Sequence, residues 1–255
     1  MAVFRSPSGD LLAAIRTYAA AMADRPLLAV AHRAGNTMAD LRAALDAGVH
    51  LVETDVHLYR DALEVRHRKA IGPHFYWEKW WEVNRRRDIV LPELTEVLAE
   101  AGAHPGLMLD LKGPGLDVAS EVAALLRRHA PGMPVTVCTK QWRMLDAFDD
   151  DPNVRRVYSA AHPLQLRQLR ALLRERRVDG LSIHRGLLRP DVVAELRRAT
   201  DLIMVWPVDT EAALEHARWL GVTGVISKNL AILRQLGAAD REEAADWAEQ
   251  VPALL

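Results

Sequence analysis

Short apolar runs alternate with longer segments of helical period along most of the chain. Eight runs have the length and composition of buried parallel strands, at residues 27–32, 51–56, 107–112, 134–138, 154–158, 180–184, 202–206 and 223–227. Helices are predicted after each of them, at 37–47, 92–102, 117–130, 141–149, 163–177, 190–199, 210–220 and from about 229. Eight strands, each followed by a helix, predict a closed α/β fold of the (β/α)8 TIM barrel type. The active site of such a barrel lies on the loops after the carboxyl ends of the strands.

Residues 68–90 interrupt this alternation between the second strand and the second helix. The segment carries six Lys or Arg residues and three of the seven tryptophans of the chain, Trp77, Trp80 and Trp81. A connection of this length is usually functional, so we expect it to cover the active site or to pack its aromatic side chains on the barrel top as a small helix. An extra amphipathic helix is predicted over residues 8–24, before the first strand.

Composition predicts a single barrel domain over residues 1–255, because no Pro/Gly/Ser-rich linker or low-complexity tract divides the chain. The 33 basic and 34 acidic side chains nearly cancel, which argues against a nucleic-acid partner. Cys138 is the single cysteine, so an intramolecular disulfide is excluded and a reducing compartment is favoured. No apolar run reaches the length of about 18 residues that a transmembrane helix needs, and a cytoplasmic location is expected. The oligomeric state stays open.

Three carboxylates lie on two of the predicted strands. Period-2 alternation places Glu53 and Asp55 on one face of the second strand, and it aligns Asp110 with Lys112 on the third. Clustered carboxylates repel one another unless a cation lies between them, and three of them suit one hard divalent ion, Mg²⁺ or Ca²⁺. Taken singly, an acid at a strand end is more often a helix cap or a surface residue. Zinc is disfavoured, since no Cys/His cluster has suitable spacing.

Two histidines are placed close to these acids. His32 and Arg33 stand at the carboxyl end of the first strand, and His67 follows the second strand. A metal-assisted attack on a phosphodiester needs this set of groups, because the ion and the cationic side chains of Arg33 and Lys112 compensate phosphate charge.

Seven motifs in this order resemble those of the glycerophosphodiester phosphodiesterase family, over about residues 27–229. His32-Arg33 resembles the opening His-Arg-Gly, and residues 48–56 are similar to Gly-Ala-Asp-x-Ile-Glu-x-Asp-Val. Residues 63–67 resemble the strand that ends in the second His, residues 91–98 the Pro-Thr-Leu-x-Glu-Val-Leu helix start, and residues 109–112 the Ile-Glu-x-Lys segment. Residues 205–209 resemble Trp-Thr-Val-Asn, and residues 221–227 resemble Gly-Val-Asp-Gly-Ile-x-Thr.

The resemblance implies a hydrolase that cleaves glycerophosphodiesters to an alcohol and glycerol 3-phosphate, with a place in lipid metabolism. Its small-molecule substrate would react by in-line displacement of the alcohol at phosphorus, with His32 and His67 as a general acid and base pair. Which histidine is the acid stays open, as does the choice between water and a substrate hydroxyl as the nucleophile. The resemblance assigns the divalent ion to Glu53, Asp55 and Asp110, and phosphate or substrate contacts to Arg33, Lys112 and Trp206.

Several positions depart from the family pattern and keep alternatives open. Ala34 stands in place of Gly, Arg68 in place of Asp, Asp110 in place of Glu, and residues 227–229 in place of Thr-Asp. The Asp-x-Lys segment is also similar to sphingomyelinase D type phospholipases, so a lysophospholipase D or sphingomyelinase D-like enzyme that releases choline or a cyclic phosphate is the alternative. A second alternative is an inactive barrel that binds phosphate esters. A third is a Schiff-base isomerase or aldolase, for which Lys112 and Lys140 are the candidate lysines.

Overall fold

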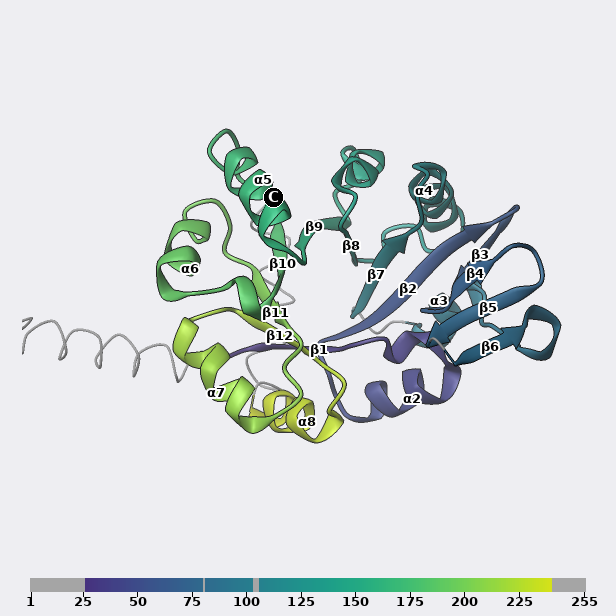
Figure 1. Cartoon of the computed structure of the whole chain (residues 1–255), viewed down its shortest axis with the longest axis horizontal. Coiled ribbons are helices and arrows are strands. Elements are labelled where there is room, and N and C mark those ends of the chain that lie inside the picture. Colours follow the sequence, from purple (N-terminus) through teal and green to yellow (C-terminus); the bar gives the residue numbers. More distant parts are fainter. Residues whose placement is uncertain (1–25, 80, 103–105, 240–255) are drawn as a thin grey trace, which may run out of the picture.

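The computed structural model describes residues 26–79, 81–102 and 106–239. All eight predicted parallel strands form, and they surround the centre of the molecule (Figure 1): β1 (Leu28–Ala31), β2 (Leu51–Tyr59), β7 (Leu107–Lys112), β8 (Val135–Thr139), β9 (Val154–Ala160), β10 (Gly180–His184), β11 (Ile203–Trp206) and β12 (Gly224–Ser227). They pair in the order β1-β12-β11-β10-β9-β8-β7-β2, and pairing of β1 with β2 closes the barrel. The TIM-barrel prediction is confirmed.

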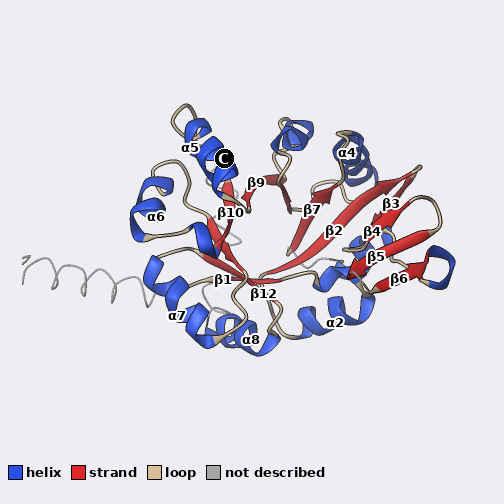
Figure 2. Ribbon diagram, in the orientation of Figure 1, coloured by secondary structure: helices blue, strands red, loops and turns tan. Residues whose placement is uncertain are grey.

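Helices form an outer ring around the strands (Figure 2): α2 (Met38–Asp46), α3 (Leu94–Ala101), α4 (Asp117–His129), α5 (Pro163–Leu172), α6 (Pro190–Leu196), α7 (Glu211–Leu220) and α8 (Leu230–Ala239). Side-chain caps begin several of them; for example, the Thr37 hydroxyl accepts the Asp40 N–H at 3.1 Å. The helix predicted at 141–149 is instead a 3-10 helix, η3 (Trp142–Phe148), a form that is frequent in connections between elements but seldom this long. The helix predicted at 8–24 lies outside the described residues.

The segment after β2 contains more strand than the sequence pattern indicated. β3 (Ala62–Val65) pairs antiparallel with β2, and this pairing carries β2 on to Tyr59, beyond the predicted end at Val56. Residues 68–90 form a three-stranded antiparallel sheet of β4 (Lys69–Ile71), β5 (Phe75–Lys79) and β6 (Glu82–Arg85), followed by η2 (Arg86–Asp88). A small helix was therefore the wrong alternative there; exposure alternates along β5, with Phe75 exposed and Tyr76 buried, as in a strand with one covered face.

The hydrophobic core has two layers. Side chains such as Leu41, Val97 and Phe148 pack between the strands and the helices. A smaller cluster inside the barrel includes Val30 and Met108. Because this cluster fills the barrel interior, an open site can form only at the ends of the strands.

Among the described residues, no helix is both long enough and apolar enough to cross a membrane.

Candidate active site

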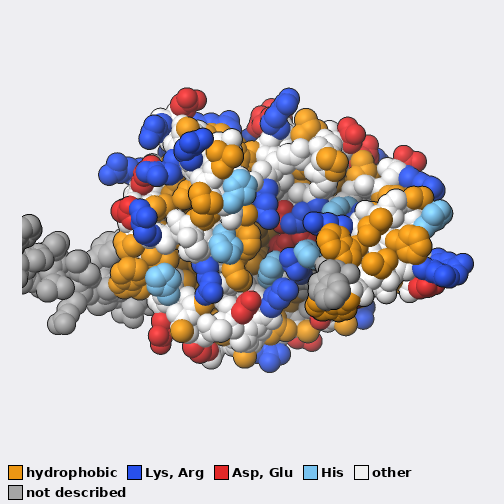
Figure 3. Space-filling view, in the orientation of Figure 1, with side chains coloured by type: hydrophobic (Ala, Val, Ile, Leu, Met, Phe, Trp, Pro, Cys, Tyr) orange, Lys and Arg blue, Asp and Glu red, His pale blue; other side chains and the backbone are white. Residues whose placement is uncertain are grey.

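The three predicted carboxylates come together at the carboxyl end of the barrel. Parallel register places Asp55 of β2 beside Asp110 of β7, and one side-chain oxygen each from Glu53, Asp55 and Asp110 lies within 4.8 Å of the others. We call these three residues the carboxylate cluster. Figure 3 shows acidic side chains at the bottom of a hollow in this face, with Lys, Arg and His side chains around it.

Burial destabilises the ionised form of the carboxylates in this cluster. Burial and the neighbouring charges of Asp55 and Asp110 raise the pKa of Glu53 well above its ordinary value. Burial also raises the pKa of Asp110, with a further contribution from Asp55. The pKa of Asp55 is lowered in spite of burial, because the ammonium of Lys112 lies against it and Asn36 donates a hydrogen bond to it.

Lys112 supplies part of the compensating positive charge. Its Nζ lies 2.9 Å from Asp55 Oδ1 and donates to Asp110 Oδ2. Burial alone would lower the pKa of Lys112, but Asp110, Asp55 and Glu53 outweigh burial and raise it, so the ammonium stays charged. One ammonium faces three carboxylates, and the buried Asp110 Oδ1 has no hydrogen-bond partner among the described residues. An additional cation with a preference for oxygen ligands fits this arrangement.

The turn after β1 orients the cluster from one side. Arg33 adopts a left-handed backbone conformation, with φ 60°, and its N–H donates to Glu53 Oε2 at 2.5 Å. The Arg33 Nε lies 3.7 Å from Asp55 Oδ2. Gly35 in the same turn is required by space, because a Cβ there would overlap the side chain of Thr54.

Asn36 is a positioning residue to which the sequence argument gave no role. Its Nδ2 donates to Asp55 Oδ2 at 2.7 Å, and its Oδ1 accepts the Asp55 N–H at 2.8 Å. This reciprocal pair fixes the orientation of the carboxylate. Its place shortly after His32-Arg33 was the available signal in the sequence.

His32 directly follows β1 and lies beside the cluster. Its Nε2 is 4.0 Å from Glu53 Oε2, and its backbone N–H donates to the Ser227 carbonyl at 2.8 Å. Burial and the charge of Arg33 lower the pKa of His32 to about 4. The imidazole is therefore neutral at pH 7, and its approach to Glu53 is not an ion pair.

His67 comes shortly after β3, on the side of the cluster that Asp55 occupies. The preceding residue, Arg66, donates its N–H to the Asp55 carbonyl at 2.9 Å. His57, on β2, lies close enough to His67 for the charge of His67 to contribute to the lowered pKa of His57. Burial is the main cause, and the pKa of His57 falls to about 3. The structure thus brings both predicted histidines to the end of the barrel that holds the carboxylates.

Trp206 lies at the rim of the barrel, half-buried at the end of β11. Its ring meets the His184 ring edge-on, with centroids 5.0 Å apart, and Lys140 Nζ lies 5.2 Å from the Trp206 centroid. Burial and the charge of Lys112 lower the pKa of Lys140, while Asp110 acts in the opposite direction. Lys140 therefore interacts with both the Trp206 ring and the charged groups of the cluster. Sequence reasoning weighed Lys140 only as a Schiff-base lysine and gave it no place beside Trp206.

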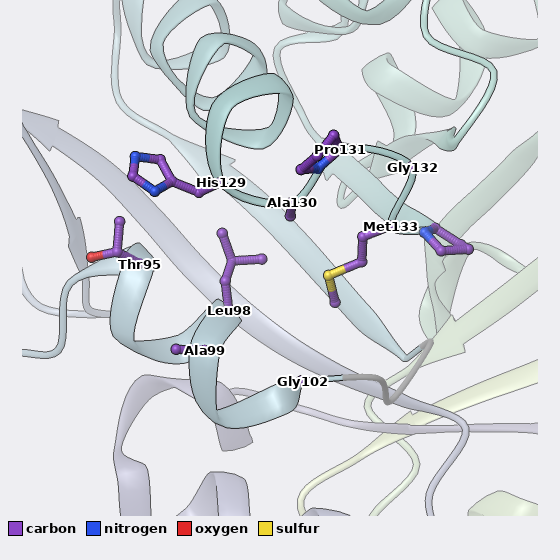
Figure 4. Close-up of a pocket in the computed structure, with 10 residues that line it drawn as sticks. Thr95, Leu98, Ala99, Gly102, His129, Ala130, Pro131, Gly132 and Met133 are labelled. Carbon is purple, nitrogen blue, oxygen red and sulfur yellow. The ribbon is translucent and has the colours of Figure 1, made fainter.

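A cavity of about 600 Å³ lies away from this site, near the amino ends of β7 and β8 (Figure 4). Leu98 and Ala99 of α3 face residues 129–133 across it. Its described lining residues offer a single titratable side chain, His129, so the cavity has none of the chemistry of the carboxylate cluster.

No family model matches the sequence, and a search of curated proteins finds no match either.

Solved structures resemble the chain over most of its length. A protein from Silicibacter pomeroyi DSS-3, described as a glycerophosphoryl diester phosphodiesterase, matches 84% of this chain and 94% of its own, with a TM-score of 0.69 and 18% identity. The glycerophosphodiester phosphodiesterase from Thermotoga maritima matches 82% and 98%, with a TM-score of 0.66 and 17% identity. A phosphodiesterase from Oleispira antarctica, solved with the product sn-glycerol-3-phosphate, matches 87% and 98%, with a TM-score of 0.63 and 18% identity. The chain therefore shares the barrel fold of solved glycerophosphodiester phosphodiesterases.

Proposed function

We propose that the protein is a metal-dependent phosphodiesterase that hydrolyses glycerophosphodiesters to an alcohol and glycerol 3-phosphate. The observation that carries the proposal is the carboxylate cluster, whose oxygens lie within 4.8 Å of one another beside His32 at the mouth of the barrel. The fold likeness to phosphodiesterases supports the same reaction class, and one of them was solved with glycerol 3-phosphate.

Glu53, Asp55 and Asp110 would hold one divalent ion, Mg²⁺ or Ca²⁺. The ion would supply Lewis-acid stabilisation of the charge that develops on the phosphate. Arg33 and Lys112 lie against Asp55, and in the proposed complex their cationic groups would donate to phosphate oxygens next to the ion.

The histidines would move the two protons of the reaction. A neutral His32 can accept the proton of the attacking water as the new P–O bond forms. His67 would then donate a proton to the leaving alkoxide as the old P–O bond breaks. Protons are conserved over the cycle when His32 later returns its proton to solvent and His67 regains one. Trp206 at the rim would contact the substrate alcohol.

A lysophospholipase D or sphingomyelinase D-like activity is the second candidate. The observation that favours it is the segment of β4, β5 and β6 after His67, which exposes Phe75 on β5 and Trp81 in the connection between β5 and β6. Exposed aromatic side chains on this segment would suit a substrate with an acyl chain.

One assay panel separates these readings. Glycerophosphocholine, glycerophosphoethanolamine, lysophosphatidylcholine and sphingomyelin are each incubated with the protein and Mg²⁺ or Ca²⁺, and ³¹P NMR reads the products. We expect glycerol 3-phosphate from the two soluble diesters and no turnover by an Asp55→Asn control. Faster turnover of the lipids, or a cyclic phosphate product, would favour the second candidate. If no substrate is turned over, the result would favour the alternative of an inactive barrel that binds phosphate esters. A cytoplasmic location and the single domain over 1–255 stay predictions.

A further inference from the structure

We propose that the sheet of β4, β5 and β6 docks the protein on the surface of an anionic phospholipid membrane. The cross-strand register places two rows of side chains on one face of this sheet, which we call the outer face. Ile71, Phe75 and Arg85 form the first row, and Lys69, Trp77 and Val83 form the second. Four apolar side chains thus share a surface with two cations.

The outer face is exposed, although most of its residues are hydrophobic. The exposed fractions are 47% for Ile71, 41% for Phe75 and 54% for Val83, whereas Tyr76, on the opposite face, is 1% exposed. Trp81, in the connection between β5 and β6, is 65% exposed. A contiguous apolar surface of this kind on a water-soluble fold marks an interaction site.

The inner face shows why the outer face is left open. The Tyr76 hydroxyl donates to Glu64 Oε2 at 3.3 Å, and Arg66 lies over the Tyr76 ring with its Cζ 5.3 Å from the centroid. Arg86 pairs with Glu64 and stacks on Tyr59, its Cζ 3.5 Å from that centroid. These contacts hold the sheet against β2 and β3 by its inner face, so its orientation beside the barrel is set.

Charge on this segment identifies an anionic partner. Residues 68–90 contain six basic and three acidic side chains, although the whole chain carries a net charge of −1. Lys69 Nζ lies 5.5 Å from the Trp77 centroid, so one cation stands directly beside an apolar side chain, as in interfacial membrane anchors. Two acids of the segment offset part of this charge, since Asp88 lies 3.6 Å from the Arg87 Nε and Glu82 lies 3.6 Å from the Arg68 Nη2.

A cavity at the edge of the outer face would accept a phospholipid headgroup. It has a volume of about 620 Å³ and shares Phe75 and Arg85 with the outer face. The other residues that line it are Pro73, His74, Arg86 and Arg87. Arg86 is paired with Glu64 on the inner face, so Arg85 is the guanidinium of the outer face that would bind the phosphate oxygens of a headgroup and add to the burial of apolar side chains.

Docking would also orient the barrel. In the space-filling view, hydrophobic side chains gather over β4–β6 on the same face that opens onto the acidic side chains (Figure 3). The mouth of the barrel would therefore point to the lipid surface. This surface goes beyond the proposed hydrolysis, and it is tested by binding without turnover, so failure of one does not imply failure of the other.

Co-sedimentation with vesicles tests the proposal. We expect the protein to bind equimolar phosphatidylcholine–phosphatidylglycerol vesicles and to bind phosphatidylcholine vesicles much more weakly. Neutralising Lys69 and Arg85 together (K69Q/R85Q) should weaken binding to anionic vesicles roughly fivefold for each cation removed, and high salt should have a similar effect. Phe75→Ser should weaken it about tenfold or more, as expected from the lost burial of one Phe side chain.

Trp219→Ser is the matched control, because this aromatic residue at the end of α7 is 47% exposed and lies far along the chain from the sheet. It should bind as the unaltered protein does, and thermal unfolding checks that each variant is folded. Absence of binding to anionic vesicles, or binding that K69Q/R85Q and F75S leave unchanged, would overturn the proposal. So would a dimer in solution that F75S dissociates while no vesicle is bound, because the outer face would then belong to a second copy of the chain.

Discussion

At the scale of single residues, the site depends on how each carboxylate is held. Asp55 accepts a hydrogen bond from the Asn36 amide, donates its backbone N–H to the Asn36 Oδ1 and forms an ion pair with Lys112, so its orientation is determined before any ion binds. Glu53 has the Arg33 N–H as its hydrogen-bond donor and keeps a raised pKa because of burial. The quality of an ion site at this position therefore depends on the side chains around the ligands as well as on the ligands.

Replacing Asn36 by Ala should weaken Mg²⁺ binding by about 10–100-fold, the range typical for loss of a group that orients a ligand. Calorimetric titration with Mg²⁺ measures the change. Asn153→Ala is the control, because Asn153 bonds Asp151 in an exposed turn. Unchanged affinity in the Asn36 variant would show that Asp55 needs no such support.

His32→Ala and His67→Ala should each lower kcat by about 10²-fold or more, the scale of a lost general acid or base. Steady-state kinetics on glycerophosphocholine gives kcat and KM separately. His216→Ala is a matched control on α7, where the ring stacks on Trp219 with centroids 5.4 Å apart. A rise in KM with kcat unchanged would assign that histidine to binding.

At the scale of elements, the turn after β1 must approach β2 closely. Gly35 lies against Thr54, and the N–H of Arg33 in the same turn reaches Glu53. The packing of this turn on β2 and the geometry of the site are therefore coupled. A change that lifts the turn would move Arg33 and Asn36 away from the carboxylates.

Gly35→Ala should destabilise the protein by about 1–3 kcal/mol, because the new methyl overlaps the Thr54 side chain. Thermal unfolding should show a fall in Tm of about 3–10 °C. Gly115→Ala is the control, since the nearest atom to a Cβ there is 3.7 Å away. Adding Thr54→Ala to Gly35→Ala should restore part of the loss. Equal stability of the Gly35 and Gly115 variants would contradict the steric argument.

At the scale of the whole molecule, the barrel carries an acidic cluster at the end of its buried interior that Lys112 and Arg33 compensate only in part. Three carboxylates and one ammonium leave the folded protein with buried negative charge, which unfolding would return to water. A bound cation would remove that cost. The cluster should therefore be a stability element as well as a site of chemistry.

Mg²⁺ or Ca²⁺ at about 100 times its dissociation constant should stabilise the fold by roughly 2.7 kcal/mol, a rise in Tm of about 5–10 °C that excess EDTA reverses. Thermal unfolding measures the shift without any substrate. Asp55→Asn should abolish the shift. Glu100→Gln, which alters a partly exposed acid paired with Arg42, should retain it. An identical Tm with ion and with EDTA would remove the metal from the proposal.

The sequence by itself determined the eight strands and the face on which Glu53 and Asp55 stand. Both follow from local periodicity, since the spacing of apolar residues reports burial and a period of two fixes which side chains share a face. Asp110 and Lys112 were assigned to one face of their strand for the same reason.

Only the tertiary structure decided which side chains meet. Pairing between β2 and β3 lengthened β2 past Val56, and the same kind of pairing made residues 68–90 a sheet rather than a helix. The bonds from Asn36 to Asp55, the approach of Lys140 to Trp206 and the raised pKa of Glu53 arise between segments far apart in the chain. Local periodicity carries no information on such contacts, because strand register and burial are properties of the assembled barrel.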